Sequence, residues 1–468
     1  MVVFEVVVLA RVNDLANDKV PGLVLRLAIP AMLAQFVNVL YSIVDRMYIG
    51  NIPEIGGVAL AGAGVCGPIV TLISSFAFLV GIGGAPLMAM RMGEGNKKGA
   101  QQILANCFVL LLGLSVILAI GFFAAKRYLL FWFGASEVTY PYANEYLSVY
   151  LAGTVFAILS VGLNQFIVCQ GFSTIAMVSV LIGAVCNILL DPVFIFALDL
   201  EVAGAAVATV LSQAASCIFT LLFLFGGRTR IRITFGGYSW RIMRRVMLFG
   251  ISPFLIAASD SVILIVFNSM LQRYGGPRQG DLYVACATIV QSYMQMITLP
   301  LGGITVGTQP VLSFNYGAKR IDRIKAGFRS ILLLCLVFNG TMFLLSQFVP
   351  QIFVRIFTQD PQYIELSAWG IRIFTAGVLI LAFQYTFVDG LTALGIAKVA
   401  VPLSMLRKVL FLASTVLLPP LFGAKAAFFS EPVADILGGI VCITVFSLLI
   451  GKILKKRENM PDGQALYE

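Results

Sequence analysis

The chain contains no histidine and few charged residues, and both shortages narrow its possible functions. Without histidine, Ser–His–Asp and Cys–His catalysis are excluded, together with the commonest protein ligand of transition metals. Only 12% of the 468 residues are charged, whereas 59% are hydrophobic. Soluble domains carry roughly 25% charged residues, so this composition is typical of a membrane protein. We therefore predict no catalytic residues and no enzymatic activity.

The eight cysteines also lack any metal-binding or disulfide pattern. All of them fall within apolar segments, and no Cys-x-x-Cys pair occurs. A free cysteine in such a setting behaves as a small apolar packing residue. The sequence therefore predicts no zinc site, no disulfide framework and no bound cofactor.

Twelve apolar stretches are long enough to cross a membrane, since each span needs about 20 apolar residues. They lie at 23–50, 57–90, 99–125, 142–170, 173–197, 203–226, 241–273, 281–315, 324–350, 362–394, 397–422 and 427–454. The expected fold is an all-α polytopic membrane protein with twelve transmembrane helices. Basic residues gather in alternate loops, and this positive-inside bias places both termini in the cytoplasm. The net charge of +10 thus reflects topology, and we expect no nucleic-acid partner.

The chain repeats itself at an offset of about 223 residues. Leu27-Ala28-Ile29-Pro30 matches Gly250-Ile251-Ser252-Pro253, and Gly83-Gly84-Ala85-Pro86 matches Gly307-Thr308-Gln309-Pro310. Because each copy holds six spans, the copies are parallel repeats related by a pseudo-two-fold axis along the membrane normal. The predicted organisation is an N-terminal arm (1–22), an N-terminal six-helix bundle (23–226), a basic cytoplasmic linker (227–240), a C-terminal six-helix bundle (241–454) and a cytoplasmic tail (455–468). Such a pseudo-symmetric chain is expected to work as a monomer.

Two carboxylates lie inside predicted spans, Asp45 in the first and Asp191 in the fifth. An ionised acid near the middle of a membrane helix costs about 2.5–3.5 kcal/mol on insertion scales, which favours a functional role. Both acids precede the outer end of their span by about six residues, roughly 9 Å at the helical rise. Asn187 shares a helix face with Asp191, and Thr209 in the sixth span reaches the same level. These four residues are our candidate cation site.

The residue types at this site leave two ligands open. Four oxygen donors could bind a hard cation such as Na⁺, with Asp45, Asn187, Asp191 and Thr209 as its ligands. Two neighbouring carboxylates could instead share a proton. Structural readings also exist: Asp191 could end a helix at the water boundary, Asp45 could pair with Arg46, and Thr209 could serve helix packing.

Several motifs together resemble one transporter family. They are Leu27-Ala28-Ile29-Pro30, Tyr41-Ser42-Ile43-Val44-Asp45-Arg46-Met47-Tyr48-Ile49-Gly50, Asn187-Ile188-Leu189-Leu190-Asp191-Pro192-Val193-Phe194-Ile195-Phe196, Gly204-Ala205-Ala206-Val207-Ala208-Thr209 and Gln309-Pro310-Val311-Leu312-Ser313-Phe314-Asn315-Tyr316-Gly317-Ala318-Lys319. The chain resembles prokaryotic multidrug and toxic compound extrusion (MATE) transporters over essentially all twelve spans. The resemblance implies two six-helix bundles that export drug-like, often cationic compounds in exchange for H⁺ or Na⁺.

The resemblance also implies roles for particular residues. It maps the cation site of the N-terminal bundle onto Asp45, Asn187, Asp191 and Thr209, and it adds Asn38 and Tyr146 as polar partners. Substrate is expected between the bundles, where Gln291, Met294 and Met296 are candidate contacts; a core or lipid-facing role is the alternative. Acids of the second half would either attract cationic substrate or make interhelical hydrogen bonds; they are Asp260, Asp389, Glu431 and Asp435.

The expected function is secondary antiport by alternating access in the cytoplasmic (inner) membrane. H⁺ or Na⁺ would be the coupling ion, and the partners would be a small organic substrate and membrane lipid. The alternative is a flippase for a lipid-linked precursor, from a related transporter branch. A flippase of that kind needs a cationic cavity for pyrophosphate, whereas the span interiors here carry more acid than base.

Overall fold

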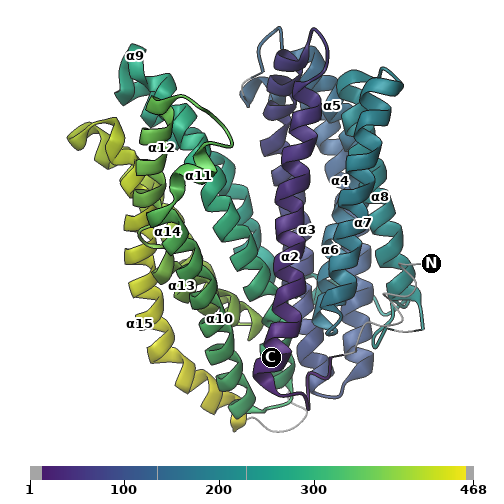
Figure 1. Ribbon diagram of the computed structural model, residues 1–468. Helices are drawn as coiled ribbons and strands as arrows, with labels where there is room; N and C mark the ends of the chain where they lie inside the picture. Colours follow the sequence, from purple (N-terminus) through teal and green to yellow (C-terminus); the bar gives the residue numbers. More distant parts are fainter. Residues whose placement is uncertain (1–12, 134, 228, 460–468) are drawn as a thin grey trace. The chain divides into compact units, whose positions relative to one another are not determined.

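The computed structural model describes residues 13–133, 135–227 and 229–459, which are almost entirely helical and contain no strand (Figure 1). The helices are α2 (Val20–Gly50), α3 (Gly56–Gly93), α4 (Lys97–Trp132), α5 (Tyr140–Ala152), α6 (Thr154–Cys169), α7 (Ser173–Pro192), the π-helix η1 (Val193–Ala197), α8 (Glu201–Phe225), α9 (Trp240–Gly317), α10 (Ile321–Phe348), α11 (Pro350–Val354), α12 (Pro361–Phe374), α13 (Val378–Ala393), α14 (Ala397–Phe422), the 3-10 helix η2 (Ala424–Phe429) and α15 (Ser430–Glu458). The all-α prediction is therefore confirmed.

The predicted spans correspond closely to the observed helices. Among the described residues, ten helices are long and apolar enough to cross a membrane, or up to twelve spans are present if each of two bent helix pairs forms one span. The long helix α9 supplies two of these spans, because Gly276 interrupts it at φ 69°, a conformation that glycine adopts without strain. The bent pairs are α5 with α6, at 58°, and α12 with α13, at 48°. Each bent pair is the fourth span of its half, as a repeated architecture requires.

The chain divides into two compact units. Unit 1 contains Ile29–Met88 and Asn96–Ser261, and unit 2 contains Asp14–Ala28, Ala89–Gly95 and the chain from Val262 onward. Most of the predicted N-terminal bundle thus lies in unit 1, and most of the C-terminal bundle lies in unit 2. The beginning of the first span, up to Ala28, and the end of the second, from Ala89, belong to unit 2, however. The first part of α9, up to Ser261, belongs to unit 1.

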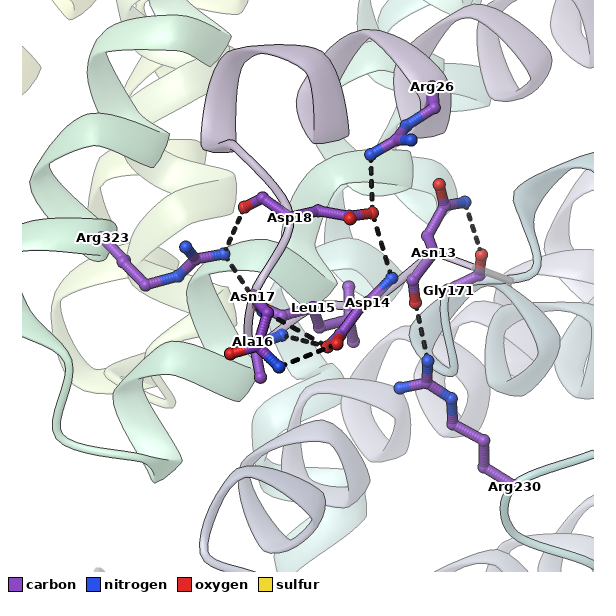
Figure 2. A network of polar contacts seen from close by, with 10 residues as sticks. All are labelled: Asn13, Asp14, Leu15, Ala16, Asn17, Asp18, Arg26, Gly171, Arg230 and Arg323. Atoms are coloured by element: carbon purple, nitrogen blue, oxygen red, sulfur yellow. Dashed lines mark hydrogen bonds and ion pairs between the residues drawn. The ribbon is translucent and has the colours of Figure 1, made fainter. Parts of the chain in front are cut away.

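The segment before α2 is held by polar contacts within unit 2 (Figure 2). Leu15 is fully buried, and Arg323 donates from Nη2 to the carbonyl oxygens of Leu15 at 3.1 Å and Asp18 at 2.8 Å. The Asp18 carboxylate also pairs with Arg26 at 2.6 Å. Part of the predicted arm is therefore packed structure; its residues 1–12, like residues 460–468 of the predicted tail, lie outside the described chain.

Small residues in α8 bring the helices of the candidate site close together within unit 1. The helix packs against α5, α6 and α7, and its alanines 205, 206 and 208 are fully buried. A Cβ on Gly204 would lie 2.6 Å from the carbonyl oxygen of Phe194, so only glycine permits this approach of α8 to η1. Small residues commonly allow such close backbone packing between membrane helices. The approach places Thr209 beside α7.

Candidate functional site

Asn187 links the predicted residues of α7 and α8. Its Nδ2 donates to Asp191 Oδ1 at 3.1 Å and to Thr209 Oγ1 at 3.4 Å. Asn187 and Asp191 share a face of α7 because they are one helical turn apart. Asp191 is completely buried and Asn187 is 2% exposed. Three of the four predicted cation-site residues are therefore joined by hydrogen bonds in the interior of unit 1.

Asp45 of α2 lies in the same electrostatic neighbourhood. Its charge acts on the Asp191 carboxyl and on the hydroxyl groups of Tyr41 and Tyr146. The charge of Arg46 also acts on Asp45, but the Arg46 side chain is exposed, and Asp45 Oδ1 is buried without a hydrogen-bond partner. Pairing with Arg46 thus leaves one oxygen of Asp45 unsatisfied.

Three buried oxygens at this site have no hydrogen-bond donor: Asp45 Oδ1, Asn187 Oδ1 and Asp191 Oδ2. Leaving a buried acceptor unsatisfied costs about 1–3 kcal/mol, and more when the group is charged. A bound proton or a hard cation such as Na⁺ would supply a missing partner at these oxygens and cancel one of the two carboxylate charges. The complete burial of Asp191 also argues against the reading in which this acid simply reaches water at a helix end.

The local backbone supports a specialised role for Asp191. Helix α7 ends at Pro192 and continues directly into the π-helix η1. Proline cannot donate a backbone hydrogen bond, and π-helical turns frequently occur at functional sites. Asp191 therefore lies at a helix irregularity that a strictly α-helical reading of the apolar run does not predict.

The chemistry of the site is limited to oxygen ligands. Within the described part of the chain, no group of three or more histidine, cysteine, aspartate or glutamate side chains could hold a metal ion. The eight cysteines are free, and seven of them are buried. Two carboxylates with an amide and a hydroxyl suit a proton or a monovalent hard cation better than a transition metal.

The additional polar partners implied by the resemblance divide into two cases. Tyr146 of α5 is 9% exposed and lies close enough to Asp45 to feel its charge. Asn38 is half-buried, and its Nδ2 donates to Gln35 Oε1 at 3.3 Å. Tyr146 is thus placed near Asp45, whereas the hydrogen bond of Asn38 is a local one along α2.

Two tyrosines near the acids were missed by the sequence reasoning. Tyr41 feels the charges of both Asp45 and Asp191, and Tyr150, which is 1% exposed, lies close to Tyr41. Helical spacing could have found both residues, because Tyr41 is four residues before Asp45 and Tyr150 is four residues after Tyr146. The Tyr41 hydroxyl thus adds a polar group of α2 near the two acids.

The predicted substrate contacts lie in varied surroundings. Met294 is 5% exposed in the interior of unit 2, while Gln291 and Met296 are half-buried. Asp260 is exposed and belongs to unit 1, and Asp389 in unit 2 accepts a hydrogen bond of 2.5 Å from Thr305. Contact of these five residues with substrate stays a prediction.

Comparison with known families supports the repeat and the architecture. The MatE family model matches residues 30–193 and 254–417, which together make up more than half of the chain. The two matches begin at residues 30 and 254, as expected for the predicted repeat.

Two curated relatives align with nearly the whole chain. Multidrug export protein MepA of Staphylococcus aureus (strain NCTC 8325 / PS 47) is 23% identical over 443 residues, covering 93% of this chain and 95% of the relative. Multidrug export protein MepA of Staphylococcus haemolyticus (strain JCSC1435) is 24% identical over 418 residues, covering 87% and 89%.

Solved structures share the fold. One is an outward-facing conformation of a multidrug resistance MATE family transporter of the MOP superfamily; it matches with a TM-score of 0.87 and 23% identity, covering 94% of this chain and 98% of that chain. A MOP superfamily transporter from Pyrococcus furiosus Vc1 (DSM3638) matches with a TM-score of 0.87 and 22% identity over the same shares. The family is that of the MATE transporters, which are not enzymes. The protein is therefore a multi-pass membrane protein that belongs to the MatE family.

Proposed function

We propose that the protein is a secondary antiporter that exports organic, often cationic, drug-like compounds in exchange for H⁺ or Na⁺. The proposal rests chiefly on the carboxylates of Asp45, which is half-buried, and Asp191, which is buried. Their charges interact, and Asp45 Oδ1 and Asp191 Oδ2 lack hydrogen-bond donors. Membership of the MatE family and the multidrug export relatives support it. The basic residues of alternate loops further favour the cytoplasmic (inner) membrane, with both termini in the cytoplasm.

The coupling step would consist of loading and emptying this site. An empty site holds two like charges in a low-dielectric interior, and a proton or Na⁺ removes part of that repulsion. Asn187 holds Asp191 and Thr209 in fixed positions for the ion. Alternating access follows if the two arrangements of the protein differ in ion affinity, because a ligand shifts a conformational equilibrium only by its differential affinity.

The flippase alternative receives less support from the described residues. A lipid-linked pyrophosphate would require buried cations, whereas the polar site of unit 1 contains the buried carboxylate of Asp191 and the half-buried carboxylate of Asp45. Export of a cationic or neutral organic compound fits this charge better.

Reconstituted vesicles can identify the driving ion directly. We expect ethidium uptake into proteoliposomes to rise above that of protein-free vesicles under an imposed pH gradient at equal Na⁺, or under an imposed Na⁺ gradient at equal pH. Ionophores that collapse the effective gradient should remove the increase. Uptake whose rate depends on neither the pH gradient nor the Na⁺ gradient would contradict antiport.

Thr209→Val tests the hydroxyl of the proposed ion site. Valine keeps the shape of the side chain but removes the oxygen that accepts from Asn187. Losing one neutral hydrogen-bonding group costs about 1 kcal/mol, which corresponds to a roughly fivefold weaker apparent affinity for the coupling ion. The measurement is the ion concentration that gives half-maximal driven uptake.

Ser212→Ala provides the matched control on the same helix. The Ser212 hydroxyl donates to the Ala208 carbonyl of its own helix at 2.7 Å, so its removal should leave ion affinity unchanged. Equal effects of the two substitutions would argue against a specific role for Thr209.

A further inference from the structure

Unit 2 contains a buried charge cluster that the proposed coupling site does not use. Arg407 of α14 donates from Nε to Asp435 Oδ1 at 2.7 Å and forms an ion pair through Nη2 with Glu431. Both acids lie on α15, four residues apart and therefore on one face. Asp435 is completely buried, Glu431 is 7% exposed, and the Arg407 side chain is 12% exposed. One guanidinium of α14 thus forms ion pairs with two carboxylates of α15, and both helices are apolar spans.

The hydrogen bonding of this cluster is incomplete at two oxygens. Asp435 Oδ2 is buried without a partner and lies 3.3 Å from the position of a Cβ on Gly377, at the break between α12 and α13. Gln384 of α13 is 4% exposed, and its Oε1 also lacks a donor. A Cβ on Gly438 would lie 3.3 Å from that oxygen and 3.4 Å from the Arg407 Cβ, so Gln384 Oε1 is directed at the face of α15 that carries the cluster.

Other charged and titratable groups face the cluster from α14 and α13. The charge of Lys408, which is half-buried, acts on Asp435, and Tyr385 acts on Arg407. The positive charge of Lys408 compensates part of the carboxylate charge through space, whereas Tyr385 carries no positive charge. Asp435 Oδ2 nevertheless has no hydrogen-bond donor.

The cluster is specific to the second half of the chain. At the repeat offset of about 223 residues, the first half has Ala184, Ala208 and Ser212 in place of Arg407, Glu431 and Asp435. It is therefore not a copy of the Asp45 and Asp191 site. Buried ion pairs are costly and are frequently no more stable than apolar packing, so stability alone is a weak reason for three ionisable groups within membrane spans.

We propose that Asp435, which shares Arg407 with Glu431, is a second proton-binding site, located in unit 2. A proton on Asp435 Oδ2 would neutralise the buried carboxylate and remove the cost of leaving this charged oxygen without a hydrogen-bond donor. Arg407 would remain hydrogen-bonded through Oδ1. This proposal goes beyond the antiport proposed above and does not depend on it.

Infrared difference spectroscopy follows proton binding without transport. Purified protein in lipid is exposed alternately to alkaline buffer and to mildly acidic buffer in which exposed carboxylates stay ionised, and the C=O stretch of protonated carboxyl groups is recorded. An Asp45→Asn/Asp191→Asn background removes the contribution of unit 1. We expect a carboxyl band in this background, and Asp435→Asn should remove the intensity of one carboxyl group from it. Asp322→Asn, which alters an exposed acid at the start of α10, should leave the band unchanged.

Isotope labelling provides a test that needs no change at Asp435. Aspartate labelled with ¹³C at the side-chain carboxyl should shift the band, because the proposal assigns it to an aspartate. A spectrum that Asp435→Asn leaves intact, or a band that the label does not move, would overturn the proposal, as would the absence of any carboxyl band. Failure of the antiport proposal would appear separately, in the vesicle assays.

Discussion

Asp191→Asn is expected to abolish ion-driven export of ethidium while the protein remains folded and inserted. Asparagine keeps the shape of the side chain and can still accept the hydrogen bond from Asn187. It removes the charge that a proton or Na⁺ would neutralise, so ion binding can no longer shift the equilibrium between the two arrangements of the protein. Driven transport should then fall to the level of protein-free vesicles. The same loss is expected for Asp45→Asn, because Asp45 acts electrostatically on Asp191.

Asp199→Asn is the matched control for these substitutions. Asp199 is exposed in unit 1 and has a φ of 53°, a region that asparagine tolerates as well as aspartate does. The control should transport ethidium at the wild-type rate in the same proteoliposomes. Size-exclusion profiles of all variants would verify folding. Normal driven efflux by both Asp45→Asn and Asp191→Asn would reject the proposed site.

The meeting of the α7 and α8 residues could be predicted because helical geometry is regular. Asn187 and Asp191 share a face because residues four apart in an α-helix always do. The depth of Thr209 in the membrane follows from the helical rise per residue. The hydrogen bonds from Asn187 to both partners agree with that reasoning. The membrane spans could be predicted equally well, because each is a long apolar stretch of the sequence.

Other features could not be predicted because apolar composition does not encode them. The bends at Gly153 and before Val378 leave the fourth and tenth spans as hydrophobic as an unbroken helix would be. The division of α9 between the two units likewise depends on packing and not on the boundary of the repeat. The Arg407 cluster needed coordinates too, since its acids lie 24 and 28 residues from Arg407 and meet it only when α14 packs against α15.

Close packing of α3 against the first part of α9 makes Gly250 a position of high expected sensitivity. A Cβ on Gly250 would lie 1.7 Å from the carbonyl oxygen of Leu79 and 2.8 Å from the Leu79 Cα. Across the same contact, a Cβ on Gly83 would lie 2.4 Å from the carbonyl oxygen of Val246. All three of these neighbours are backbone atoms, which cannot move aside by a change of rotamer. The two helices must therefore separate if either glycine gains a side chain.

Gly250→Leu is expected to destabilise the packing of unit 1 strongly. Overfilling a core usually costs about 1–3 kcal/mol, and a clash with backbone atoms should reach or exceed the upper end of that range. Gly113→Leu is the matched control, because Gly113 is exposed on α4 with no atom within 4 Å of its Cβ position, and leucine favours a helix over glycine by up to about 1 kcal/mol. We expect Gly250→Leu to lose the monodisperse size-exclusion peak or to melt at a clearly lower temperature, while Gly113→Leu melts at or above the wild-type temperature. Equal melting of the two variants would mean that α3 and α9 are not packed this closely.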